Sequence, residues 1–209
     1  MSATPAHSDP QGLLAHLLLH HDINQLNADY AAALDEKRFD DWPMFFLEEG
    51  RYKLQARENF DRQLPLALMD LESRGMMKDR VYGVTQTIYH GPYYMRHVVG
   101  PARVLARDDN FIRAEANYAV FRTRPGGVSE VYNVGRYIDE LVHIDGILKF
   151  RSRLAVYDSE MVLNSLIYPV CLQPGRGHCL QRSSLLRSKL AMHIKKGDAR
   201  IPGITFFAC

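Results

Sequence analysis

The chain has 209 residues, of which 46% are hydrophobic and 24% are charged. This length and composition suit one globular domain with a sizeable core. No apolar run approaches the length of a membrane-spanning helix, and the first ten residues lack the pattern of a secretory signal, so we expect a cytoplasmic protein. The net charge is −4 over residues 1–170 and +6 over residues 171–209. An acidic body argues against a dedicated nucleic-acid binder.

The first third of the chain is predicted to be mainly helical. Residues 1–11 are polar and contain proline, so we expect a disordered terminus there. A helix is predicted over residues 13–34, because apolar residues recur every three or four positions as Leu19, Ile23, Leu26 and Tyr30.

A second, short helix is predicted over residues 42–47, with Asp40 or Asp41 as its N-cap and Pro43 in its first turn. We expect Glu49-Gly50 to end it and a strand to follow over residues 51–56. Residues 59–79 indicate a helix with connecting loops, ended by Gly75, and residues 80–89 indicate an extended connection.

Residues 93–158 are the most informative stretch, because they predict four long strands in one mostly antiparallel sheet. Turn-forming sequences separate the strands at residues 108–110, 125–127 and 145–146. Gly135 is expected at a bulge or bend where the sheet curls, and residues 161–170 are expected to form a short cap. In the last strand we expect one buried face and one polar face, respectively Leu148, Phe150, Leu154 and Val156 against Lys149, Arg151, Arg153 and Tyr157.

Several kinds of catalytic chemistry lack their motifs in residues 1–170. This stretch contains no cysteine, so it offers no cysteine ligands for zinc or an iron–sulfur cluster. It also shows no glycine-rich phosphate loop and no nucleophile elbow. We therefore expect no redox or thiol chemistry from this part of the chain.

Histidines and one tryptophan are the remaining candidates for a site. His16 and His20 have the helical spacing of metal ligands, but no third ligand is obvious and exposed positions on a helix are the favoured explanation. His97, beside Arg96, could act as an acid or base inside the sheet, or hydrogen-bond a neighbouring strand or subunit. Trp42 could form a ligand platform with Phe45 and Phe46, but packing of the helix on the sheet is the favoured interpretation.

The basic residues of the last strand, Lys149, Arg151 and Arg153, have two interpretations. They could bind an acidic partner, or they could pair across strands with acids such as Glu130 or Asp139, which we favour.

Taken in order, these residues resemble the small (beta) subunits of the aromatic-ring-hydroxylating, Rieske-type non-haem iron oxygenases. The resemblance runs from about Leu13 to Val170 and is closest to the types acting on salicylate (5-hydroxylation), anthranilate and benzoate. The matching positions are Tyr30-x3-Leu34-Asp35, Trp42-x2-Phe45-Phe46, Tyr52, Asp79-Arg80-Val81, Arg96-His97, Gly135-x-Tyr137-x-Asp139-x-Leu141, Asp145-Gly146, Phe150-Arg151-Ser152-Arg153 and Tyr157-Asp158.

The resemblance implies an α+β, cone-shaped fold, in which a strongly curved sheet wraps on N-terminal helices as in nuclear-transport-factor-like and cystatin-like domains. It implies an assembly of three small and three large subunits. The large subunit would hold the Rieske [2Fe–2S] cluster and the mononuclear iron, and a reductase, with or without a ferredoxin, would supply electrons from NADH or NADPH. The small subunit would be structural and hold no catalytic, cofactor or metal residues, with Trp42, Arg96, His97 and Arg153 at or behind interfaces.

Residues 171–209 depart from that family pattern. They are basic, contain all three cysteines and have no recognised counterpart, so we expect low order there. They are either a real extension that contacts an acidic surface or an accidental reading-frame extension. The domain predicted from the sequence therefore spans residues 12–170.

Two other functions compete with the oxygenase subunit. A stand-alone isomerase or dehydratase of the same fold would need a buried ionisable pair, which His97 with Tyr52 or Tyr118 could provide. A small-ligand binding module would need an open, uncharged hollow. The apolar residues Leu54, Leu148, Phe150 and Leu154 favour a filled hollow instead.

Overall fold

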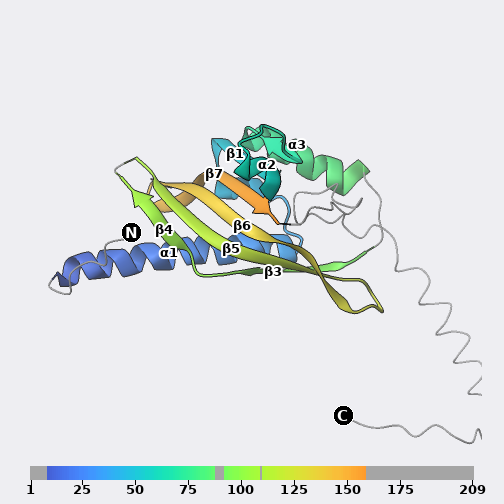
Figure 1. The fold of residues 1–209 in the computed structure, drawn as a ribbon, viewed down its shortest axis with the longest axis horizontal. Helices are drawn as coiled ribbons and strands as arrows, with labels where there is room; N and C mark the ends of the chain where they lie inside the picture. Colours follow the sequence, from blue (N-terminus) through green and yellow to red (C-terminus); the bar gives the residue numbers. More distant parts are fainter. Residues whose placement is uncertain (1–8, 88–91, 109, 159–209) are drawn as a thin grey trace, which may run out of the picture. The chain divides into compact units, whose positions relative to one another are not determined.

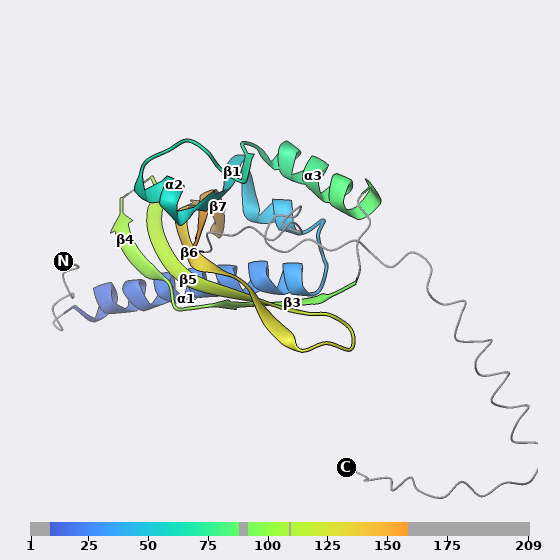
Figure 2. The ribbon, with the colours of Figure 1, turned by 45° about the vertical axis from the view of Figure 1, so that its right-hand side comes forward.

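The computed structural model describes residues 9–87, 92–108 and 110–158. In these residues one seven-stranded sheet has the order β2-β1-β7-β6-β5-β3, with β4 also paired to β5. Figures 1 and 2 show this sheet curving over the long helix α1 (Pro10–Asp35). The neighbours pair antiparallel except β1 and β7, which are parallel. The predicted α+β class with a curved, mostly antiparallel sheet is confirmed.

Helix α1 begins earlier than predicted. The Asp9 side chain caps it by accepting a hydrogen bond from the backbone N–H of Gln11, and Pro10 occupies the first helical position. Pro10 and Gln11 therefore belong to the helix and not to a disordered terminus. Residues 1–8 lie outside the described residues. The predicted apolar stripe is buried at Leu19, Ile23 and Tyr30.

The short second helix is a 3-10 turn, Trp42–Phe45, and strand β1 (Phe46–Ala56) follows it directly. The predicted strand start at residue 51 is wrong, because Phe46 is fully buried and pairs with Phe150 of β7. Glu49-Gly50 does not end a helix. It lies where the pairing register between β1 and β7 shifts, so the strand continues through it.

The segment after β1 also differs from the prediction. It contains α2 (Arg57–Asp61), β2 (Met69–Leu71), α3 (Arg74–Tyr82) and a π-helical turn, Gly83–Thr87. Ser73 caps α3 by accepting from the backbone N–H of Met76, so Gly75 lies in the first turn of a helix that it was expected to end. Residues 80–87 are therefore helical and not extended. Residues 88–91 lie outside the described residues, as does the predicted cap at 161–170.

The predicted four-strand block contains five strands: β3 (Tyr94–Val99), β4 (Arg103–Arg107), β5 (Ile112–Thr123), β6 (Ser129–Ile144) and β7 (Ile147–Tyr157). Gly100-Pro101 divides the first predicted strand, because proline cannot donate to a strand ladder. The turns lie where they were predicted. Asp145 and Gly146 both have positive φ, as a tight hairpin turn requires.

Gly135 marks a close approach between strands and not a bulge. It lies between Tyr118 of β5 and Tyr157 of β7, and a Cβ atom there would come 2.0 Å from the carbonyl oxygen of Val156. The bulges occur elsewhere, between Val120 and Phe121 of β5 and between Glu140 and Leu141 of β6 in the pairing register.

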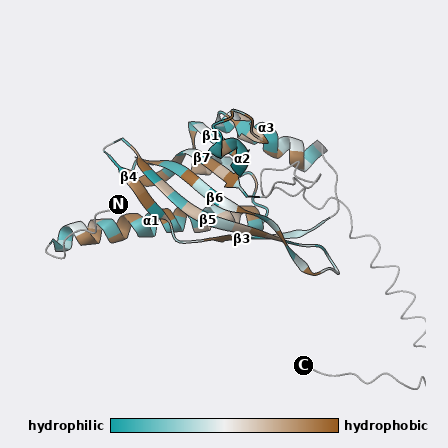
Figure 3. Cartoon of the chain, in the orientation of Figure 1, coloured by the Kyte–Doolittle hydropathy of each residue, from teal (hydrophilic) through white to brown (hydrophobic). Residues whose placement is uncertain are grey.

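The second of these bulges reverses the predicted faces of β7. Glu140 pairs with Ser152 and Leu141 with Phe150, so Arg151 is an extra residue in β7. Beyond it the alternation shifts by one position, which turns Arg153, Ala155 and Tyr157 into the interior. The predicted placement of Arg153 and Tyr157 on a polar face is therefore wrong. Figure 3 shows the alternation of hydrophobic and hydrophilic residues along the strands.

Helix α1 also protects the exposed edge of the sheet. The Asp35 carboxylate accepts from the backbone N–H of His97 in β3 at 3.1 Å, and Asn24 accepts from Ala102 at 2.9 Å. Satisfying edge N–H groups in this way blocks further strand pairing. Among the described helices, none is long and apolar enough to cross a membrane.

Candidate functional site

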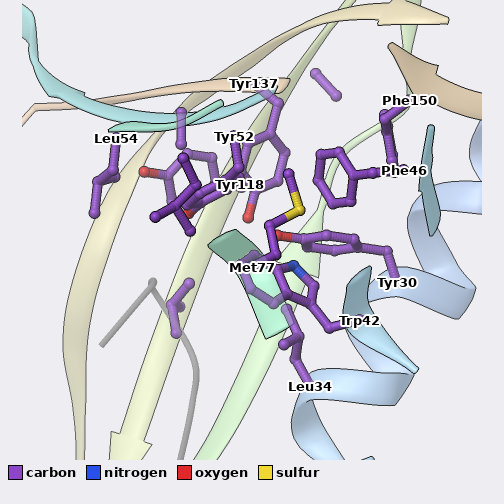
Figure 4. Close-up of a cluster of buried hydrophobic side chains, with 14 of the residues drawn as sticks. Tyr30, Leu34, Trp42, Phe46, Tyr52, Leu54, Met77, Tyr118, Tyr137 and Phe150 are labelled. Atoms are coloured by element: carbon purple, nitrogen blue, oxygen red, sulfur yellow. The ribbon is translucent and has the colours of Figure 1, made fainter. Parts of the chain in front are cut away.

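Aromatic side chains occupy the interior between α1 and the sheet (Figure 4). They come from α1, the 3-10 turn and four strands, and each has at most 3% of its surface exposed: Tyr30, Trp42, Phe46, Tyr52, Tyr118, Tyr137 and Phe150. Tyr118 stacks on Tyr137 with ring centroids 4.2 Å apart, while Trp42 meets Tyr52 and Phe46 edge-on. Such contacts stabilise an aromatic core beyond the area that they bury. Trp42 is thus a core residue, as favoured from the sequence.

A buried ion pair lies inside this aromatic cluster. Arg153 donates two hydrogen bonds of 2.8 Å to the two carboxylate oxygens of Asp139, and the side chains are 0% and 1% exposed. The guanidinium carbon lies 3.9 to 4.4 Å from the ring centroids of Phe150, Tyr137 and Tyr30. Burial alone would lower the pKa of Arg153, but Asp139 outweighs it and raises that pKa. The predicted cross-strand pairing with Asp139 is confirmed, whereas Glu130 pairs with Arg122.

The ion pair also connects the sheet to the helix. Arg153 donates a further hydrogen bond to the side-chain oxygen of Asn27, which is itself buried in the middle of α1. Three elements, α1, β6 and β7, therefore meet at one guanidinium. A planar group with five fixed donors suits such a junction better than a lysine would.

The interior tyrosines are held in their neutral form. Burial raises the pKa of Tyr52 and Tyr137 well above the usual value, and it also raises that of Tyr30, where Arg153 acts in the opposite direction. The Tyr118 hydroxyl donates to Asn133 at 2.7 Å. A general acid or base needs a pKa near the working pH, so these phenols are poor candidates for proton transfer.

His97 has a partner that the sequence did not indicate. Its Nδ1 lies 2.6 Å from the carboxylate of Asp35, the last residue of α1, and its side chain is fully buried. The isomerase hypothesis required Tyr52 or Tyr118 beside His97, but the contact that the structure shows is with Asp35. The His97–Asp35 contact joins the end of α1 to β3. It borders a surface cleft of about 630 Å³ between these two elements.

Of the other candidates, Arg96 lies at the rim of this junction, whereas His16 and His20 lie elsewhere on α1. Arg96 faces away from the interior, with 77% of its side chain exposed, and its guanidinium is 3.9 Å from Asp35. His16 and His20 contact each other on α1 with ring centroids 4.4 Å apart. No group of three or more metal-binding side chains occurs in the part of the chain that the structure describes.

Asn27 and the pairing of Asp35 with His97 were missed from the sequence, and Arg153 was placed on the wrong face although its pairing with Asp139 was predicted. Asn27 was hidden because a polar residue in a helix normally points to water, and Asp35 was interpreted as the end of the helix. Arg153 was assigned to the wrong face because the bulge at Arg151 left no trace in the pattern. A polar residue at a stripe position, as Asn27 is relative to Ile23 and Tyr30, was the available signal.

Comparison with known proteins shows where this fold belongs. The model of the SnoaL-like domain family matches residues 15–154. Over 149 residues the chain is 30% identical to the small subunit of anthranilate 1,2-dioxygenase from Burkholderia cepacia, covering 71% of this chain and 92% of that protein. The chain belongs to the SnoaL-like family, among the small subunits of aromatic-ring-hydroxylating dioxygenases.

Two further relatives agree with this assignment. A beta subunit of the terminal oxygenase component of terephthalate 1,2-dioxygenase from Comamonas sp is 28% identical, over 71% of this chain and 96% of that protein. A crystal structure from Novosphingobium aromaticivorans, provisionally assigned as the beta subunit of an aromatic-ring-hydroxylating dioxygenase, is 32% identical with a TM-score of 0.68. That match covers 74% of this chain and 97% of that one. The resemblance stated from the sequence is confirmed.

Proposed function

We propose that this small subunit is a non-catalytic scaffold that holds the large, iron-containing subunits of a Rieske oxygenase in place, three of each. The observation that carries this proposal is the filled interior, where enzymes of this fold would need an open, polar hollow. Aromatic rings and the Arg153–Asp139 pair occupy that space at near-zero exposure.

The large subunit would carry the Rieske [2Fe–2S] cluster and the mononuclear iron. Residues 1–170 contain no cysteine, and the described residues bring no three metal-binding side chains together, so this part of the chain does not fit either centre. In such an assembly a scaffold acts by fixing the distance and orientation between redox centres on neighbouring subunits. A reductase, with or without a ferredoxin, would deliver electrons from NADH or NADPH in the cytoplasm.

The substrate is proposed to be an aromatic acid. The named substrates of the relatives, anthranilate and terephthalate, both carry a carboxylate on an aromatic ring. Within that class our first choice is salicylate, hydroxylated at the 5-position, which is a monooxygenation. Anthranilate and benzoate, as dioxygenation substrates, are the next choices.

Co-purification tests the scaffold role. The tagged full chain is recovered from cells that express its whole oxygenase system, and the intact complex is weighed and assayed for iron. We expect equal numbers of this chain and a larger iron–sulfur partner, with turnover of an aromatic acid in the presence of reductase, NADH and O2. A lone chain or homo-oligomer without iron would sink the proposal.

His97 tests the competing enzyme function. If the chain is a scaffold, His97→Gln should leave the product and the turnover per assembled complex unchanged, although it can reduce the yield of complex. A stand-alone isomerase or dehydratase using the His97–Asp35 pair would instead lose nearly all of its activity in the His97→Gln variant while the chain remained folded.

A further inference from the structure

The outer face of the sheet, which points away from the aromatic interior, is divided into two unlike halves. Along the beginning of β5 it carries charged pairs, in which Arg113 contacts Glu140 at 3.2 Å and Arg103 contacts Glu115 at 3.0 Å. Such exposed pairs are typical of a face that remains in water. This half therefore shows the charged surface that a solvated part of the sheet carries, and the other half differs from it.

Toward the far end of β5, the same face becomes apolar. The strand register aligns Val98 of β3 with Ala119 and Val134, and in the next row it aligns Arg96 with Phe121 and Val131. Val98 and Val131 are 57% and 61% exposed, and Tyr94 is 53% exposed in the row beyond. We call this set the apolar patch: Tyr94, Val98, Ala119, Phe121, Val131 and Val134. Ala119, Phe121 and Val134 are half-buried between the exposed members. A contiguous apolar patch that reaches the surface in this way marks an interaction site.

The edge of β3 is not available for pairing with a strand of another chain. Asp35 and Asn24 already accept from the backbone N–H groups of His97 and Ala102. Addition of a strand to this edge would have to displace α1, which is packed against it. A partner is therefore directed to the face of β3, β5 and β6 and not to the edge.

Positive charge at the patch decides which partner fits, because Lys37 places its Nζ 5.7 Å from the ring centroid of Tyr94 and Arg96 lies beside it. Arg96 lies in the middle row of the patch with 77% of its side chain exposed, and its nearest carboxylate, Asp35, is already bonded to His97. Two copies of this chain that met through the patch would bring the cations of both copies into one interface. Like charges in contact disfavour such an interface. An apolar surface that presents a carboxylate to Arg96 has the complementary chemistry.

We infer that the apolar patch, together with Arg96 on its β3 side, is the docking surface for the large oxygenase subunit. This inference rests on the proposed function, which supplies the partner. Arginine and aromatic side chains surrounded by apolar contacts are the usual energetic centres of protein interfaces. The large subunit is expected to place an apolar segment over Val98, Phe121 and Val131, and an acidic side chain against Arg96.

A pair of matched substitutions tests this surface. Val131→Glu places a carboxylate in the patch, and Ile147→Glu places one at an equally exposed strand residue outside it, since the two residues are 61% and 62% exposed. Recovery of the large subunit with the tagged full chain should fall at least about tenfold for Val131→Glu and stay within about twofold for Ile147→Glu. Thermal melting of each isolated variant checks that it still folds.

Arg96 tests the charge of the partner. Arg96→Glu should lower recovery at least about tenfold, whereas Arg96→Lys, which keeps the charge but not the planar fork, should lose less. An acidic partner predicts this order at low salt and a smaller difference at high salt.

Failure of this inference is distinguishable from failure of the proposed function. If the unmodified chain recovers no iron–sulfur partner, both fail. If it recovers the partner and Val131→Glu recovers it equally, only the docking surface is wrong. An isolated chain that is dimeric, and that Val131→Glu makes monomeric, would show that a second copy covers the patch and would overturn the inference.

Discussion

Asp139 and Glu140 are neighbours on β6, and each pairs with an arginine on an opposite face of the sheet. The Arg153–Asp139 side chains inside are 0% and 1% exposed, while the Arg113–Glu140 side chains outside are 48% and 33% exposed. The interior pair is surrounded by three aromatic rings and bonded to Asn27, but the exterior pair is surrounded by water. The difference teaches that burial, and not the pairing itself, decides how much stability the fold loses when one partner of a salt bridge is removed.

Removing one interior partner is expected to have the largest effect. Arg153→Met leaves the Asp139 carboxylate buried without a counter-charge, which destabilises proteins by about 3–5 kcal/mol. Chemical denaturation of the purified chain should show this loss, or the chain should fail to fold. The double variant Arg153→Met with Asp139→Leu removes both charges and should recover much of the loss. Equal stability of Arg153→Met and the unmodified chain would contradict the assignment.

Gly135, on the same interior face, tests how closely the strands approach. A Cβ atom there would meet the Val156 carbonyl oxygen, so Gly135→Ala forces the backbone of β6 and β7 apart. We expect a loss of about 1–3 kcal/mol, as in other overpacked sites. Gly127→Ala provides a control, because its nearest atoms are at ordinary contact distance. Thermal melting of both variants checks the prediction, and similar losses would refute it.

Alkaline pH tests the interior as a whole. Unfolded tyrosines ionise near pH 10, whereas burial raises the pKa of Tyr52 and Tyr137 in the folded chain. Above about pH 10 the unfolded state therefore binds fewer protons, so stability is complete below that pH and falls above it. Each such tyrosine should contribute a loss of about 1.4 kcal/mol at pH 11.

Tyrosinate absorbance, followed together with circular dichroism, measures this effect. Tyr52 and Tyr137 should ionise only when the chain unfolds, so their contribution to the absorbance should rise together with the loss of the circular dichroism signal. Ionisation of all tyrosines before any loss of structure would show that the interior is open to water.

Breaking the exterior pair is expected to have the smallest effect. Arg113→Ala should change the free energy of unfolding by no more than about 1 kcal/mol, because its guanidinium is half exposed and screened by solvent. Its denaturation midpoint should also depend little on salt. A loss as large as that of Arg153→Met would remove the distinction between the two faces.

The sequence alone determined the class of fold, the long first helix, the turns of the strand block and the family. The fold elements depend on local chemistry, namely the helical spacing of apolar residues and turn residues with fixed preferences. The family was indicated by a set of residues that occur in the same order as in the family that the chain resembles. These features remained correct although several of the predicted helix and strand boundaries were wrong.

The tertiary structure decided the remaining features, because they depend on contacts between distant residues. Arg151 is an extra residue in β7 only because of the way β7 pairs with β6, and this extra residue reversed the face of Arg153. Phe46 joined a strand because β7 lay beside it, and Asp35 found His97 62 residues further along the chain. A one-residue shift in register turns every later side chain to the other face, and no local pattern records it.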